Sequence, residues 1–312
     1  MLLNCCLGTI AKITGFAGLG LLISSADAAV FEVRNASADT TLIGIAPTNN
    51  NGAQQWVIAG SIQIPPSNPF RNRGLFKFDF TDLPTNTVIQ AVALKLEVTR
   101  VPDEAPSNAT FGLHRMYRPW GEGDNVAATY PGQGSPANPG GATWFWSFAP
   151  TNSWFAPGGV PGLDFANDES SFQYISGLGS YTFDFTPELA ADVQFWVNQP
   201  EFNYGWILMS NSEDVPWNAR RFGSREDPDN HPRLEISYIV PPLIDAAQRV
   251  SNSFRITFTP WPGQGYAVQF RNSLTNGLWQ TLTNLGVLTN ATPVVVTDSI
   301  ALPQRFYRVL GY

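Results

Sequence analysis

Cysteine is nearly absent from this chain of 312 residues. The two cysteines, Cys5 and Cys6, lie at the amino terminus, in a segment with the features of an export signal. A chain that has lost this segment contains no thiol, which excludes a disulfide, a zinc–thiolate site and a cysteine nucleophile. Histidine is as scarce, with only His114 and His231. Because His114 lies within a strand pattern, few histidines remain for a catalytic triad, which argues against one.

Charge is also sparse. Only 14% of the residues are charged, and the formal net charge is −7. No basic run is longer than Arg220-Arg221, which argues against a nucleic-acid partner, since that binding depends on phosphate neutralisation by lysine and arginine. Beyond the amino terminus no run reaches the roughly 18 apolar residues of a membrane helix. We therefore predict that the exported protein does not span a membrane.

The amino-terminal segment resembles a secretory signal peptide. Lys12 precedes a short apolar core at residues 13–25, and Ala26-Asp27-Ala28 follows with the small-x-small pattern of a cleavage site. We predict a signal peptide at residues 1–28 and a secreted or cell-envelope location. An uncleaved amphipathic segment is the alternative.

Glycine, proline and aromatic residues are plentiful: 27 Gly, 25 Pro and 13% aromatics. This composition predicts an all-β fold rich in loops. The clearest strand is residues 91–98, where every second residue is apolar, so one face meets a core and the other meets solvent. Similar short runs bounded by Asn, Gly or Pro are residues 40–45, 55–59, 74–80 and 110–117.

One helix is predicted after residue 186. Thr186 suits the N-cap, Pro187 the first helical position and Glu188 the positive end of the helix dipole. Four apolar residues then fall on one helical face, namely Leu189, Val193, Trp196 and Val197.

Two domains follow the signal in this interpretation. Residues 30–239 form a jelly-roll-like β-sandwich, and Pro241-Pro242 marks a linker at residues 240–243. Alternating residues 254–258 and 266–270 then predict a second, small β-sandwich of immunoglobulin or fibronectin character at residues 244–312.

A long Gly/Pro-rich loop interrupts the strands at residues 118–162. It carries four tryptophans, and a disordered segment would be poor in aromatics, so we expect an ordered excursion packed on the sheet. The rings either form a core under this loop or make a platform for a ligand. The tryptophans are Trp120, Trp144, Trp146 and Trp154.

Several motifs occur in the order seen in the DNRLRE-domain family of secreted proteins. They are SADTTL at 37–42, RGLFKFD at 73–79, WGEG at 120–123, ATW at 142–144, PGG at 157–159, VQFW at 193–196, NYGW at 203–206 and SRE at 224–226. Residues 30–239 thus resemble this family of carbohydrate-binding-module-like β-sandwiches, although the name-giving hexapeptide is absent. The resemblance implies an extracellular polysaccharide as the partner.

Sugar binding requires flat apolar faces beside hydrogen-bonding groups. Arginine forks also suit an anionic sugar such as a uronate, since they pair with carboxylates bidentately. The predicted carbohydrate-binding residues are Trp120, Glu122, Asp124, Trp144, Trp154, Trp217, Arg220 and Arg221. Arg73, Asp79, Arg225 and Glu226 are instead expected to form ion pairs that fix strand register.

Calcium is a candidate cofactor. Asp227 and Asp229 lie in an oxygen-rich turn, and Asp39 offers another carboxylate. The spacing fits no EF-hand loop, and the same residues are ordinary turn formers.

The function predicted from these features is a secreted, non-catalytic polysaccharide-binding or matrix protein. One alternative is a structural adhesion protein without a glycan site. The other is a polysaccharide lyase or glycoside hydrolase, which needs two carboxylates. Spacing singles out no pair among Glu122, Asp124, Asp184 and Glu226.

Overall fold

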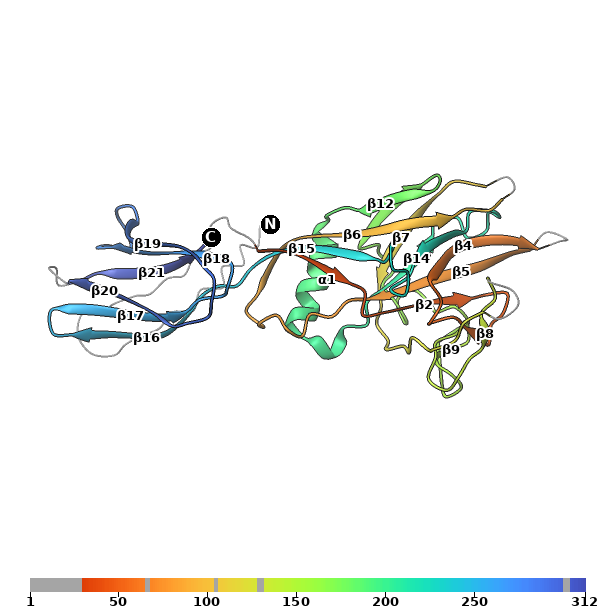
Figure 1. Ribbon diagram of the computed structural model, residues 1–312, viewed down its shortest axis with the longest axis horizontal. Helices are drawn as coiled ribbons and strands as arrows, with labels where there is room; N and C mark the ends of the chain where they lie inside the picture. Colours follow the sequence, from red (N-terminus) through yellow and green to blue (C-terminus); the bar gives the residue numbers. More distant parts are fainter. Residues whose placement is uncertain (1–29, 65–67, 104–105, 128–131, 300–303) are drawn as a thin grey trace. The chain divides into compact units, whose positions relative to one another are not determined.

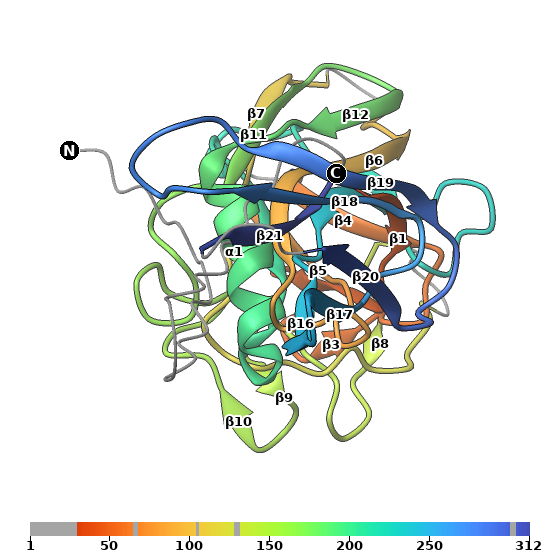
Figure 2. The same cartoon turned by 90° about the vertical axis from the view of Figure 1, so that its left-hand side faces the viewer.

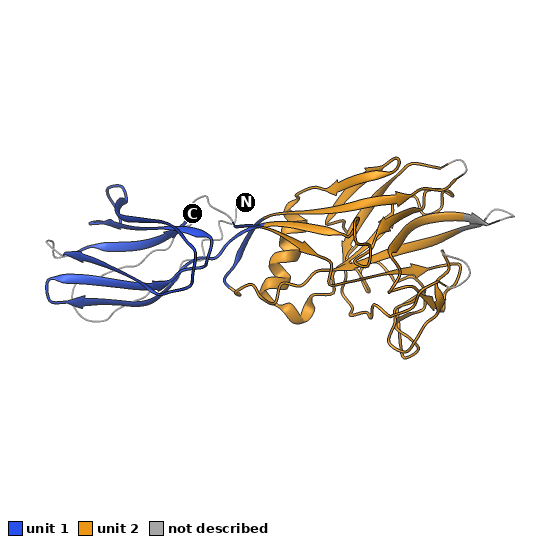
Figure 3. Ribbon diagram, in the orientation of Figure 1, with its two compact units in different colours: residues 1–31, 86–90, 237–312 blue, residues 32–85, 91–236 orange. Residues whose placement is uncertain are grey.

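The computed structural model describes residues 30–64, 68–103, 106–127, 132–299 and 304–312. The predicted signal peptide lies outside these residues. The chain divides into two compact units: residues 32–85 with 91–236, and residues 1–31 with 86–90 and 237–312 (Figure 3). The division after residue 236 falls just before the predicted linker. None of the described helices is long and apolar enough to cross a membrane.

The larger unit is built on one antiparallel sheet of eleven strands (Figure 1). Its order is β1-β15-β6-β14-β4-β5-β13-β7-β11, with β12 beside β6 and β2 beside β5. The strands are β1 (Val30–Asn35), β2 (Ala38–Ile43), β4 (Trp56–Ile64), β5 (Asn68–Lys77), β6 (Val88–Arg100), β7 (Ala109–Arg115), β11 (Ser171–Ile175), β12 (Gly179–Phe183), β13 (Trp206–Ser210), β14 (Arg220–Gly223) and β15 (Arg233–Ile239). The predicted all-β class with one short helix is confirmed.

Strand β4 joins the two halves of this sheet by changing partner. Its first residues pair with β14 and its last with β5, and Gly60 stands at the change. The φ of Gly60 is 97°, and a Cβ there would lie 2.7 Å from Asn218 Oδ1. Asn218 Oδ1 accepts the N–H of Ser61 at 2.7 Å. Glycine thus permits the bend that curls the sheet over its own core.

The main core lies between the two halves of the sheet. In β6 the alternating residues are buried, as the sequence predicted: Val92, Leu94, Leu96 and Val98 are each at most 2% exposed. Phe111 of β7 meets Phe222 of β14 edge to face, with ring centroids 5.9 Å apart. The two strands belong to different halves, so this contact crosses the core.

The predicted helix is confirmed as α1 (Pro187–Asn198). Thr186 caps it, since the Thr186 side chain accepts the N–H of Leu189 at 3.0 Å. Trp196 of the helix packs against Trp206 of β13, with centroids 4.5 Å apart. The short 3₁₀ helix η1 (Pro200–Phe202) follows.

A second core lies beneath the Gly/Pro-rich loop. Trp154 and Phe165 pack on Leu42, Leu75 and Ile207 of the sheet. The described part of the loop has three short strands: β8 (Ser135–Pro136), which pairs with β3 (Asn49–Asn50), and β9 (Trp146–Phe148), which pairs with β10 (Asn152–Ser153). The loop is therefore ordered by aromatic burial, as its composition predicted.

The smaller unit contains two three-stranded antiparallel sheets, whose strands are labelled in Figure 2. Phe254, Phe258, Tyr266 and Tyr307 are among the residues of its single described core cluster. One sheet has β16 (Leu243–Val250), β17 (Ser253–Thr259) and β20 (Val294–Ser299); the other has β18 (Gln264–Arg271), β19 (Gln280–Leu288) and β21 (Phe306–Gly311).

Candidate functional site

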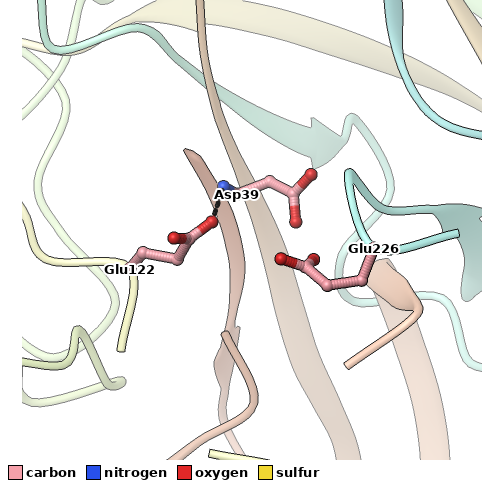
Figure 4. A group of neighbouring side chains, drawn as sticks. All are labelled: Asp39, Glu122 and Glu226. Carbon is pink, nitrogen blue, oxygen red and sulfur yellow. Dashed lines mark hydrogen bonds between the residues drawn. The ribbon is translucent and has the colours of Figure 1, made fainter. Parts of the chain in front are cut away.

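Two groups of polar residues in the larger unit are candidates for function. The first, the acidic cluster, consists of Asp39, Glu122 and Glu226 (Figure 4). Asp39 lies on β2, Glu122 in the loop after β7, and Glu226 in the turn after β14. One carboxylate oxygen of each residue lies within 4.8 Å of the others.

Arg225 and backbone amides link the three carboxylates. Asp39 Oδ2 accepts the N–H of Arg225 at 2.7 Å, and the N–H of Asp39 donates to Glu122 Oε1 at 2.8 Å. The Arg225 guanidinium donates to both Glu122 oxygens, at 2.5 and 2.9 Å. It also lies 3.0 Å from Glu226 Oε1. The network joins three segments that are far apart in the sequence: β2, the loop after β7, and the turn between β14 and β15.

The residues of the acidic cluster and Arg225 differ in burial and in the direction of their pKa shifts. Asp39 is only 1% exposed, and burial, with the charges of Glu226 and Glu122, raises its pKa well above the ordinary value of 3.8. Burial also raises the pKa of Glu226. The hydrogen bond to Glu122 raises the pKa of Arg225, which remains the cation of the group. One arginine thus faces three carboxylates.

The acidic cluster could hold a metal, because three carboxylates are hard oxygen ligands of the kind that calcium takes. Of the three predicted ligands only Asp39 belongs to it. Asp227 Oδ1 instead accepts the N–H groups of Asp229 and Asn230, both at 3.0 Å. Asp227 thus acts as a turn residue, and metal binding by Asp227 and Asp229 stays a prediction.

The second group lines a cleft of about 360 Å³, here called the Trp217 cleft. It includes three residues predicted to bind sugar, Trp217, Arg220 and Arg221. It also includes Arg100, which sequence reasoning missed. The remaining lining residues are Ile58, Ile62, Asn72, Val101, Pro102, Asp103, Gly132 and Ala219.

Trp217 is partly exposed in this cleft and has a left-handed backbone, with a φ of 67°. Its carbonyl accepts the N–H of Ser107 at 2.9 Å, and the next residue, Asn218, donates to the carbonyls of Ser212 and Val215, both at 2.7 Å. A tryptophan rarely adopts a positive φ, so the surrounding hydrogen bonds hold it there. The backbone from which the Trp217 ring projects is consequently held in place.

Arg221 lines the same cleft and supplies a cation. Its guanidinium is 4.4 Å from the centroid of the Trp56 ring. Burial and the positive charge of Arg100 lower the pKa of Arg221. Among the described residues no carboxylate forms an ion pair with Arg221, whereas Arg100 pairs with Asp103 at 2.7 Å. The cleft therefore has an excess of positive charge at Arg221.

Arg220 differs from the expectation that it contacts a sugar directly, because its side chain is fully buried. It donates to the carbonyls of Ala219 at 3.0 Å and Ser107 at 2.9 Å. Its Nε is buried without a hydrogen-bond partner, and burial lowers its pKa. Arg220 thus forms the positively charged wall behind the cleft.

Three of the loop tryptophans contact the second core. Trp154 is 3% exposed and donates from Nε1 to the Thr143 carbonyl at 2.8 Å, so its predicted role in ligand stacking is wrong. Trp120 donates to the Tyr204 carbonyl at 2.7 Å, and both Trp120 and Trp144 pack against the second core. Both rings remain partly exposed, so their role in carbohydrate binding stays a prediction.

The other predicted residues also have partners within the protein. Arg73 Nη1 donates to the Gly158 carbonyl at 2.8 Å, and its Nη2 is 2.7 Å from Glu213 Oε2. Asp124 is exposed and accepts from Asn138 Nδ2 at 2.7 Å. His114 is buried against the Ala166 carbonyl, and burial lowers its pKa, so it is neutral near pH 7. The Trp217 cleft, by contrast, brings a partly exposed ring together with Arg221, for which the described residues provide no ion pair.

No protein-family model matches this chain, and no curated protein sequence matches it significantly. The likeness to the DNRLRE-domain family therefore stays a prediction from the motifs. Three of those motifs, at residues 37–42, 120–123 and 224–226, supply Asp39, Glu122 and Arg225 with Glu226, which meet in the acidic cluster.

Proposed function

We propose that this protein is a secreted, non-catalytic polysaccharide-binding protein of the cell envelope or extracellular matrix, and that the Trp217 cleft is its sugar site. The observation that carries the proposal is that one cleft is lined by Trp217, which is partly exposed, and by Arg221, a cation that has no ion-pair partner among the described residues. Sugar sites combine an apolar stacking face with a few polar groups in the same way.

The chemistry of the cleft favours an anionic sugar. A guanidinium presents parallel N–H donors that match a carboxylate, and Arg221 is held beside Trp56 with these donors uncommitted to any described carboxylate. Positive charge from the buried Arg220 adds to the attraction for an anion, whereas Arg100 is balanced by Asp103. A uronic acid residue satisfies both features: its ring face stacks on Trp217, and its carboxylate pairs with Arg221.

The acidic cluster supports the non-catalytic part of the proposal. A glycosidase needs one carboxyl as a proton donor and a second carboxylate that can act on the sugar or on water. Glu122 is held by both guanidinium donors of Arg225 and by a backbone N–H, and Asp39 is buried. These bonds favour a role in joining the loop to β2.

Affinity electrophoresis in gels that contain polygalacturonate, or neutral xylan as the comparison, tests the proposal. We expect retardation by polygalacturonate that weakens as salt is raised, because the charge contribution is screened. Equal mobility in all gels would overturn the polysaccharide-binding proposal. Release of reducing ends or unsaturated products from polygalacturonate by the protein would overturn its non-catalytic part.

A further inference from the structure

The loop between β18 and β19 in the smaller unit exposes aliphatic side chains. Within residues 272–279, Leu278 is 88% exposed and Leu274 is 44% exposed. Leu278 has the largest exposed fraction among the large hydrophobic residues of the described chain. Isolated exposed leucines are ordinary on protein surfaces, so the surroundings of this pair decide its meaning.

The base of the same loop is cationic. The guanidinium carbons of Arg271 and Arg308 lie 5.2 and 4.5 Å from the centroid of the Trp279 ring. Arg271 is hydrogen-bonded to the Ser273 carbonyl of the loop, and no carboxylate among the described residues forms an ion pair with it. Arg308 Nε donates to Gln269 Oε1 at 2.8 Å. The loop that exposes the two leucines therefore has a tryptophan and two cations at its base.

The wider charge around the loop has the same sign. The segment Ser237–Tyr312 contains five arginines and only two aspartates, although the whole chain has a net charge of −7. Both aspartates have partners: Asp298 pairs with Arg305 at 2.6 Å, and Asp245 accepts from Thr259 at 2.8 Å. Neither aspartate forms an ion pair with Arg271.

We propose that the β18–β19 loop docks on a phospholipid membrane surface with anionic headgroups. Leu274 and Leu278 would enter the boundary between headgroups and acyl chains, where apolar side chains gain from leaving water. Trp279 would lie at headgroup depth, which is the usual position of tryptophan at a membrane interface. Arg271 would pair with lipid phosphates.

The exposed leucines favour a membrane over a polysaccharide as the occupant. A hydrated polysaccharide offers no apolar phase for an aliphatic side chain, and its usual protein contact is the face of an aromatic ring. Here the Trp279 ring is engaged by two guanidiniums, and the most exposed residue is Leu278. The inference is independent of the sugar site proposed for the Trp217 cleft.

Vesicle cosedimentation tests this proposal with the chain that begins at Val30, because the apolar leader would itself bind lipid. Vesicles contain phosphatidylcholine alone or with phosphatidylglycerol. We expect binding to the anionic vesicles. Leu278→Ser should lower the partition coefficient about tenfold, and Arg271→Gln should lower it about fivefold.

Val295→Ser is the matched control, because Val295 is 57% exposed on β20, which belongs to the other sheet of the smaller unit. This variant should bind anionic vesicles like the parent. The proposal is overturned if phosphatidylglycerol gives no binding, or if Val295→Ser weakens binding as much as Leu278→Ser. It is also overturned if the loop variants bind vesicles normally but lose retention on polygalacturonate, which would assign the loop to a polysaccharide.

Discussion

Replacing Asp39 with asparagine should stabilise the larger unit at neutral pH. Asp39 is 1% exposed, and its carboxylate meets two others with only Arg225 to offset them. Asparagine has nearly the same shape. Its side-chain oxygen can still accept the Arg225 N–H that Asp39 accepts at 2.7 Å, and its amide can donate to Glu226.

The magnitude follows from the distances. Unit charges at the 4.8 Å limit of the cluster repel by about 3.5 kcal/mol at an effective dielectric constant of about 20. Asp39 meets two such charges, and Arg225 offsets one of them. Solvent weakens the remainder, because the side chains of Glu122 and Glu226 are 18% and 21% exposed. We therefore expect a gain of about 1–2 kcal/mol in the free energy of unfolding at neutral pH.

The gain should depend on pH in a defined direction. Burial and like charges raise the folded pKa of Asp39 above its ordinary 3.8, so the folded state takes up a proton more readily than the unfolded state. The contribution of Asp39 to stability is present in full below 3.8 and is lost as pH rises through the folded pKa. The advantage of Asp39→Asn must therefore shrink as pH falls through this interval.

Urea unfolding of the parent and of Asp39→Asn across acid and neutral pH measures this difference. Asp39→Ala is the companion variant, since it removes the charge but also the acceptor for the Arg225 N–H. A result in which Asp39→Asn is less stable than the parent at neutral pH would refute the reasoning. Such a loss, together with a calcium-dependent stability in the parent only, would show that the acidic cluster holds a cation.

Three further predictions concern the same unit. Gly60→Ala should lower the free energy of unfolding by about 3 kcal/mol, because the φ of 97° and a backbone atom 2.8 Å from the new Cβ both oppose a side chain there. An unchanged free energy in urea unfolding would contradict the bend of β4 at Gly60. Trp154→Ala should cost about 4 kcal/mol and expose the loop to limited proteolysis, whereas Phe155→Ala, at a position 61% exposed, should leave both unchanged. Arg225→Gln should cost about 2 kcal/mol in the parent and less in the Asp39→Asn background, and equal costs in the two backgrounds would show that the charges do not interact.

Elements whose signals lie within one short segment could be placed from the sequence alone. The helix could be placed at Thr186 to Asn198 because its cap, its first-turn proline and its apolar face all lie within one short segment. The alternation in β6 was equally readable, since period-two burial is a property of a single strand. The sheet order was not predictable in this way, because it depends on which distant strands pair.

The candidate sites depend on such distant pairing. Asp39 and Arg225 are 186 positions apart, and no spacing rule connects them. The family-like motifs contain both residues, but the motifs do not show that these two segments meet. For the Trp217 cleft, the adjacent positions of Arg220 and Arg221 in the sequence predicted that both guanidiniums would contact the ligand. Because neighbouring residues of a strand face opposite sides, β14 instead buries Arg220 and leaves Arg221 partly exposed.

Titration calorimetry with oligogalacturonate tests the central claim, that the Trp217 cleft binds an anionic polysaccharide, most directly. Trp217→Ala and Arg221→Gln should each weaken binding about tenfold or more. Phe155→Ala and Arg249→Gln, which change an exposed ring and an exposed arginine elsewhere, should bind like the parent. Binding that is unchanged in both cleft variants, or weakened equally in the two controls, would contradict the account.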